Sequence, residues 1–152
     1  MSASSPARAD RPSRRQRWAN AVLGWLLVRG RGPDFMRLLT VRGRVTGRPL
    51  TTPVVPVQRD GRVWVVSPFG DVAWVRNARA AGRLDLHRGH ERVTYEVREL
   101  DPVEAVPVLR AYLSMPSERF VRRDFGVTAT SSDDAIAAEA TRHPVFDLTP
   151  VP

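Results

Sequence analysis

The sequence predicts a mainly β domain with inserted helices, an α+β chain folded as a small, partly open antiparallel barrel. Short runs of strand-forming residues recur from Phe35 to the C-terminus. Turn signals such as Asp60-Gly61 separate several of these runs by hairpin-length intervals, and helical patterns interrupt them at a few points. The chain has 152 residues, of which 42% are hydrophobic, enough for one domain with a core of its own.

The first 29 residues differ in character from the rest. Residues 1–17 hold five arginines and one aspartate among serines and prolines, so we expect a disordered, arginine-rich tail. Residues 18–29 repeat apolar side chains at spacings of three and four, which predicts a helix, too short to span a membrane. This helix either packs on its own domain or, through Trp18 and Trp25, lies at a membrane surface. Residues 18–152 then form the single domain.

The remaining elements follow from period and turn chemistry. We expect strands at 35–43, 49–57 and 63–67, a hairpin of two strands within 84–100, and a closing strand at 143–151, about six strands in all. Prolines in the second strand indicate a sheet edge or a bulge. Helices are expected at 71–83, at 102–115 and around 132–140. Asp101 and Glu104 predict a capping box, and Pro107 should kink the helix that follows.

Charge and composition exclude several classes of protein. The net charge is +8 and every cation is arginine, yet the tail supplies half of it (five arginines minus one aspartate). No nucleic-acid-binding motif accompanies the charge, so we expect no nucleic-acid partner. The chain lacks cysteine. It has three histidines, His87, His90 and His143, of which the first two fall in what reads as a turn. We expect surface histidines and no metal site.

Four short motifs occur in a fixed order. They are G-R-x-T-G from Gly43, T-T-P from Thr51, S-x-x-G from Ser67 and W-x-x-N from Trp74. The first lies in a cationic turn, where glycines expose backbone N–H groups and arginines add charge-assisted hydrogen bonds, a combination suited to anions. Each motif alone is weak, and their order carries the information.

With these motifs, residues 35–150 resemble the deazaflavin-dependent nitroreductase family, which uses coenzyme F-420. The resemblance implies a split β-barrel and an oxidoreductase that transfers hydride from the reduced coenzyme to an electron-poor quinone, enone or nitro compound. It also implies that the glycine turn holds the phosphate and oligoglutamate tail, while the S-x-x-G loop borders the deazaflavin ring. The implied cofactor-binding residues are Arg44, Thr46, Gly47, Arg48, Thr52, Pro53, Ser67, Gly70, Trp74 and Asn77.

Three positions depart from the family pattern. Val45 and Leu50 stand where basic residues are usual, which weakens the expected tail site unless Arg42 or Arg48 compensates. Phe69 stands where many relatives carry glycine and makes the ring loop bulkier. We therefore keep two alternatives: a barrel that binds FMN instead, and a binding module for small molecules or membranes without catalysis.

The acceptor site is the least defined part. Ser67, whose hydroxyl can stabilise charge on the ring, and Tyr112, the aromatic hydroxyl donor in the C-terminal region, are the expected catalytic residues. Tyr112 also falls on an amphipathic helix, where a core role is equally open. We expect a cytoplasmic enzyme with a small-molecule acceptor, and we leave open both a homodimer and peripheral membrane contact through the N-terminal helix.

Overall fold

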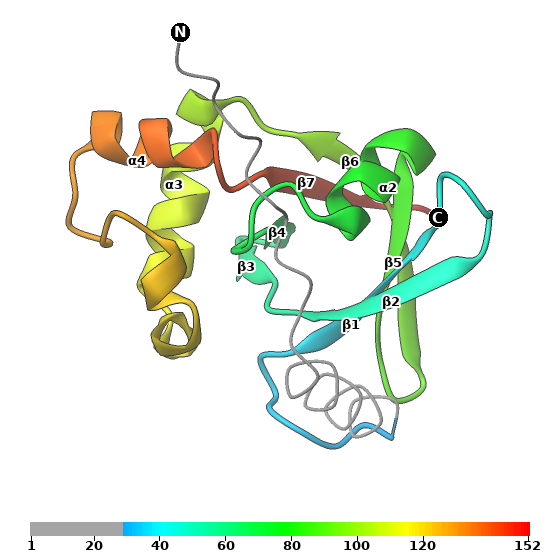
Figure 1. Cartoon of the computed structure of the whole chain (residues 1–152). Coiled ribbons are helices and arrows are strands. Elements are labelled where there is room, and N and C mark those ends of the chain that lie inside the picture. The colour runs from blue at the N-terminus through cyan, green and yellow to red at the C-terminus, as the bar shows by residue number, and fades with distance from the viewer. Residues whose placement is uncertain (1–28) are drawn as a thin grey trace, which may run out of the picture.

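The computed structural model of the protein describes residues 29–152 (Figure 1). The tail over 1–17 and the helix over 18–29, apart from Arg29, lie outside the described residues. The strands are β1 (Arg37–Arg42), β2 (Pro49–Val54), β3 (Val57–Arg59), β4 (Arg62–Val66), β5 (Arg83–Arg88), β6 (Glu91–Glu99) and β7 (Val145–Pro150). The α-helices are α2 (Ala73–Ala81), α3 (Pro102–Leu113) and α4 (Asp133–Ala140), with short 3-10 helices η1 (Pro116–Phe120) and η2 (Arg122–Asp124).

All strands join one curled sheet in the order β2-β1-β5-β6-β7-β4-β3, and every neighbouring pair is antiparallel. The sheet has two free edges, so the predicted partly open antiparallel barrel is confirmed. Of the two edge strands, β2 lies within the proline-rich segment 49–57, and β3 begins at its last residue, Val57. Since proline has no N–H to donate, an edge is where such a segment costs least.

The prediction of one strand over 49–57 is wrong. The segment breaks at Val55-Pro56: β2 stays paired with β1, while β3 pairs with β4 at the opposite edge of the sheet. The sheet therefore has seven strands rather than six. The break matters for the site, because it carries the chain from the glycine turn toward β4, which ends one residue before Ser67.

Helices cover the sheet from two sides (Figure 1). α3 and α4 pack together over β3, β4 and β7, whereas α2 lies against β1, β5 and β6. Two apolar clusters correspond to this division. One, under α3 and α4, includes Leu109 and Ile136; the other, inside the barrel and under α2, includes Leu39, Val75 and Phe146.

The predicted capping box at the start of α3 is confirmed. The Asp101 carboxylate accepts a hydrogen bond from the Glu104 amide at 2.8 Å, and the Glu104 side chain accepts one from the Asp101 amide, which completes the capping box. α3 continues through Pro107. The short helices η1 and η2 were not predicted, because their sequence carries no apolar period long enough to detect.

The prediction of surface histidines was wrong for His143. Its side chain is only 5% exposed and its ring stacks on Phe125 with 4.0 Å between centroids. His87 lies in β5 rather than in a turn, and its Nε2 contacts the Thr40 hydroxyl at 3.0 Å. Only Gly89 and His90 form the turn between β5 and β6.

Candidate functional site

The G-R-x-T-G motif forms the tight turn between β1 and β2. The Gly43 amide donates to the Arg48 carbonyl at 2.8 Å, and the Gly47 amide donates to the Gly43 carbonyl at 2.9 Å. Gly47 has a φ of 71°, in the region that favours glycine. At Gly43 a Cβ would lie 3.0 Å from the Arg48 carbonyl oxygen, so that position also requires glycine.

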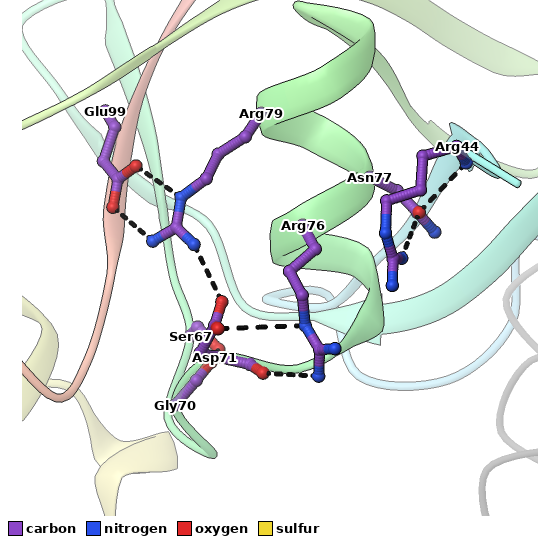
Figure 2. A network of polar contacts seen from close by, with 8 residues as sticks. All are labelled: Arg44, Ser67, Gly70, Asp71, Arg76, Asn77, Arg79 and Glu99. Atoms are coloured by element: carbon purple, nitrogen blue, oxygen red, sulfur yellow. Dashed lines mark hydrogen bonds and ion pairs between the residues drawn. The ribbon is translucent and has the colours of Figure 1, made fainter.

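Asn77, on α2, binds this turn through Arg44 (Figure 2). Its Oδ1 accepts from the Arg44 amide at 3.1 Å and from the Arg44 guanidinium at 2.8 Å. The side chain is 1% exposed, and its Nδ2 has no hydrogen-bond partner within residues 29–152. We call the two contacts to Arg44 the Asn77 bridge. A buried amide donor without a partner is costly, which makes Nδ2 a natural place for a ligand acceptor.

The outer face of the turn is cationic. Arg42 and Arg48 are exposed, and in the described part of the chain neither guanidinium has a hydrogen bond or ion pair. Within that same part the amides of Val45 and Thr46 also lack partners. Two amides and two guanidinium groups are therefore available to an anion. Val45, 85% exposed at the tip, adds no charge, as the departure from the family pattern implied.

The S-x-x-G motif forms a compact loop between β4 and α2. The Ser67 hydroxyl donates to the Gly70 carbonyl at 2.6 Å, and the Ser67 side chain is 0% exposed. Ser67 thus shapes the loop rather than projecting from it. Gly70 has a φ of 82°, and a Cβ there would lie 3.2 Å from the Arg142 carbonyl oxygen. Phe69 is 56% exposed, so it is the side chain that this loop presents outward.

Ion pairs that the sequence analysis missed anchor the loop to α2 and β6. Arg79 donates to Glu99 through two nitrogens at 2.6 and 2.7 Å and to Asp71 at 2.8 Å (Figure 2). Arg76 donates to the Asp71 carbonyl at 3.0 Å. The bidentate bond to Glu99 raises the pKa of Arg79 above its usual range. Arg76 and Arg79 lie three residues apart on a predicted helix, and this spacing is the sequence signal from which a shared acidic partner could have been predicted.

The other predicted cofactor residues lie farther from the turn tip. Trp74, on α2, is half-buried with its ring 5.8 Å from that of Phe146. Thr52 and Pro53, on β2, are half-buried opposite Leu39 and Leu38. The structure brings Arg44 and Asn77 into direct contact, and likewise Ser67 and Gly70, but it shows no contact between the two pairs.

Tyr112 belongs to a different region. It is buried in the cluster under α3 and α4, and its ring lies 5.9 Å from that of Phe125. Burial raises its pKa to about 12. The expected role of Tyr112 as a donor to substrate stays a prediction, and its environment is that of a packing residue.

A cavity of about 890 Å³ lies between α3, β3 and the segment that precedes β1. Its lining includes the apolar side chains of Phe35, Val57 and Met115 and the arginines Arg37 and Arg59. None of the predicted cofactor residues lines it. No cluster of metal-ligating side chains occurs in residues 29–152, and no helix there combines the length and apolar character needed to cross a bilayer.

Known structures share this architecture. One titled as an F420-H2 dependent reductase is 18% identical, with 76% of this chain and 95% of that chain covered and a TM-score of 0.55. One titled as a domain-swapped dimer is 16% identical, with 88% and 98% covered and a TM-score of 0.55. A pyridoxamine 5'-phosphate oxidase-like protein from Listeria innocua is 9% identical, with 78% and 86% covered and a TM-score of 0.53. The expected split-barrel fold is therefore confirmed.

Fold and sequence together define the class: a split-barrel oxidoreductase that depends on deazaflavin coenzyme F-420. The model of the F420H(2)-dependent quinone reductase family matches residues 12–130, and the chain belongs to that family. No protein with a curated description matches it closely.

Proposed function

We propose that the protein reduces a quinone with F-420, holding the coenzyme's anionic tail at the glycine turn and its ring at the Ser67–Gly70 loop. The observation that carries the proposal is the position of α2. The helix begins three residues after Gly70, and Asn77, about one turn further along, reaches the glycine turn. With a rise of about 1.5 Å per residue, the two motifs lie within the length of one elongated ligand.

The groups left without partners fit an anionic tail. Arg42 and Arg48 would bind phosphate or carboxylate oxygens, and the amides of Val45 and Thr46 would donate to the same oxygens. The buried Nδ2 of Asn77 would find an acceptor there too. Arg44 would act mainly by shaping the turn, because Asn77 already holds its guanidinium.

The ring end depends on a rigid loop. The bound, reduced coenzyme supplies hydride to the acceptor. The chain's own part is to hold the Ser67–Gly70 backbone fixed beside the ring, and the exposed Phe69 would cover the ring and exclude water. The family description favours a quinone as the acceptor, with nitro compounds and enones as further candidates.

The test is a titration of the purified protein with F-420 and FMN, read by absorbance and fluorescence. We expect binding of F-420, and oxidation of reduced F-420 by a soluble quinone faster than by a nitro compound or an enone. Binding of FMN in place of F-420 would establish the alternative cofactor, and binding without turnover of any acceptor would leave a binding module.

We also propose a cytoplasmic location with peripheral contact at anionic membranes. The basis is sequence alone: tryptophans and arginines over residues 1–29. Deletion of residues 1–17 should leave the barrel folded and weaken co-sedimentation with anionic vesicles, because each basic residue near such a surface contributes about 1 kcal/mol. Unchanged co-sedimentation would remove the tail from membrane binding. Light scattering of the same samples distinguishes a monomer from a homodimer.

A further inference from the structure

His143 lies at the junction between α4, β7 and the Ser67–Gly70 loop. Its Nδ1 is 3.2 Å from the Ser67 carbonyl oxygen, and its Nε2 is 3.1 Å from Oε1 of Glu139. Both side chains are almost fully buried, and the His143 ring is stacked on Phe125. A histidine fixed on three sides in this way cannot turn to other partners.

The same junction borders the loop at both ends. The Ser67 amide donates to the Pro144 carbonyl at 2.9 Å, and a Cβ on Gly70 would lie 3.2 Å from the carbonyl oxygen of Arg142. Segment 142–144 therefore supports the loop at its first and last residues. The His143 bond adds a third contact, at the Ser67 carbonyl, which also accepts from the Gly70 amide at 3.4 Å.

Both acceptors determine which protons the His143 ring must carry. A carbonyl oxygen only accepts, so Nδ1 must donate to Ser67. Burial alone would raise the pKa of Glu139, but the Gly126 amide and the Arg142 guanidinium bring it below its usual range, so Nε2 faces a carboxylate. With both nitrogens protonated, both contacts are hydrogen bonds; the neutral ring makes only one of them.

We propose that His143 is a positioning residue whose bond to the Ser67 carbonyl, aligned by Glu139, sets the geometry of the loop beside the coenzyme ring. The inference rests on the proposed placement of the ring. The charged and titratable groups around the imidazole are Glu139 from α4, Arg142 behind that carboxylate, and Tyr112 from α3 on the far side of Phe125.

Two substitutions separate the two contacts. In His143→Asn, the amide nitrogen occupies roughly the place of Nδ1 and keeps the bond to Ser67, while Glu139 loses the imidazole and keeps the Gly126 amide and Arg142. In His143→Gln, the amide nitrogen reaches the place of Nε2 and keeps Glu139 satisfied, while the Ser67 carbonyl is released. His90→Gln, at an exposed turn, is the matched control.

We expect function and stability to rank the variants in opposite orders. His143→Asn should keep kcat within about threefold of wild type, and His143→Gln should lose about tenfold or more with faster amide exchange at residues 67–71. The thermal midpoint should be higher for His143→Gln than for His143→Asn. If His143 only stabilised the fold, the variant with the lower thermal midpoint would also have the lower kcat. That result would overturn the proposal.

A readout without coenzyme separates this inference from the proposed function. Amide exchange at residues 67–71 is compared among wild type, His143→Gln, His143→Asn and His90→Gln in the absence of F-420. We expect faster loop exchange in His143→Gln and wild-type exchange in the other two variants. Equal loop exchange in all four proteins overturns the inference, whereas faster loop exchange in His143→Gln without F-420 binding by wild type overturns only the proposed function.

Discussion

The tail site depends on Asn77, whose side-chain amide is buried. Asn77→Ala would release the Arg44 amide and guanidinium together and leave a cavity, whereas Asn77→Leu would release them while filling the space and removing the unpaired Nδ2. We expect both variants to weaken F-420 binding about tenfold, or ~1.4 kcal/mol. The leucine variant should lose less unfolding free energy in urea. Equal binding by wild type and both variants would show that the bridge does not shape the tail site.

Arg42 and Arg48 carry the charge available at the turn. Arg42→Ala/Arg48→Ala should weaken F-420 binding by a few kcal/mol, since a hydrogen bond between charged groups contributes about 1.5–3 kcal/mol, and the difference should shrink as salt is added. Arg62→Ala/Arg123→Ala removes the same net charge from β4 and η2 and serves as the control. If the two double variants bind alike across a salt series, the turn is not the tail site.

At the residue scale, the sequence predicted which residues belong to the site, but not which of them bind one another and which stay available to a ligand. The order of motifs pointed to Arg44 and Asn77, yet only the structure shows that they bind each other and leave Arg42 and Arg48 available. His143 was assigned to the surface because a single histidine has no periodic signature. Its burial depends on Phe125 and Glu139, which are distant in sequence from the loop that it contacts.

The Ser67–Gly70 loop can be tested by comparing two glycines. Gly70 and Gly61 both have positive φ, but a Cβ at Gly61 meets no heavy atom within 4 Å, whereas at Gly70 it meets the Arg142 carbonyl at 3.2 Å. Alanine at either position should cost about 1–2 kcal/mol for the left-handed backbone. Only Gly70→Ala should also displace the loop and slow F-420 turnover, about tenfold or more. Equal turnover by the two variants would separate the loop from the ring.

Elements were predicted where the signal is local. The capping box at Asp101, the hairpin of β5 and β6, and the glycine end of α2 each arise from residues within a few positions of one another. The break at Val55-Pro56 was missed because it depends on where β3 finds a partner. β3 pairs with β4, which follows it directly in the sequence. The other edge of β4 pairs with β7, about eighty residues further along, so the position of this hairpin in the sheet depends on a distant strand.

For the whole molecule, we expect the free energy of unfolding to fall when the solution is acidified. Burial raises the pKa of Asp85, but the Thr94 hydroxyl and Arg92 lower it more, so the folded value lies below the ordinary 3.8. A lowered folded pKa adds stability above the unfolded value that is lost as pH falls through the folded one. The thermal midpoint should therefore drop below about pH 4. Asp85→Asn should lower the midpoint at pH 7 and have little effect at pH 3, and a constant difference would contradict this assignment.

At alkaline pH, the stability of the fold should depend on Tyr112. Burial raises its pKa from 10.0 to about 12 in the folded protein. Because the unfolded phenol ionises first, this contribution to stability is complete below about pH 10 and declines as pH rises through the folded value, by about 3 kcal/mol in all. Tyr112→Phe should keep the buried ring and its contact with Phe125 while removing much of this decline, as urea unfolding at pH 9 and 11 would show. If Tyr112 only packs, F-420 turnover by the variant should stay within about twofold of wild type. A large loss of kcat with an unchanged midpoint would instead support the predicted role of its hydroxyl as a donor to the acceptor.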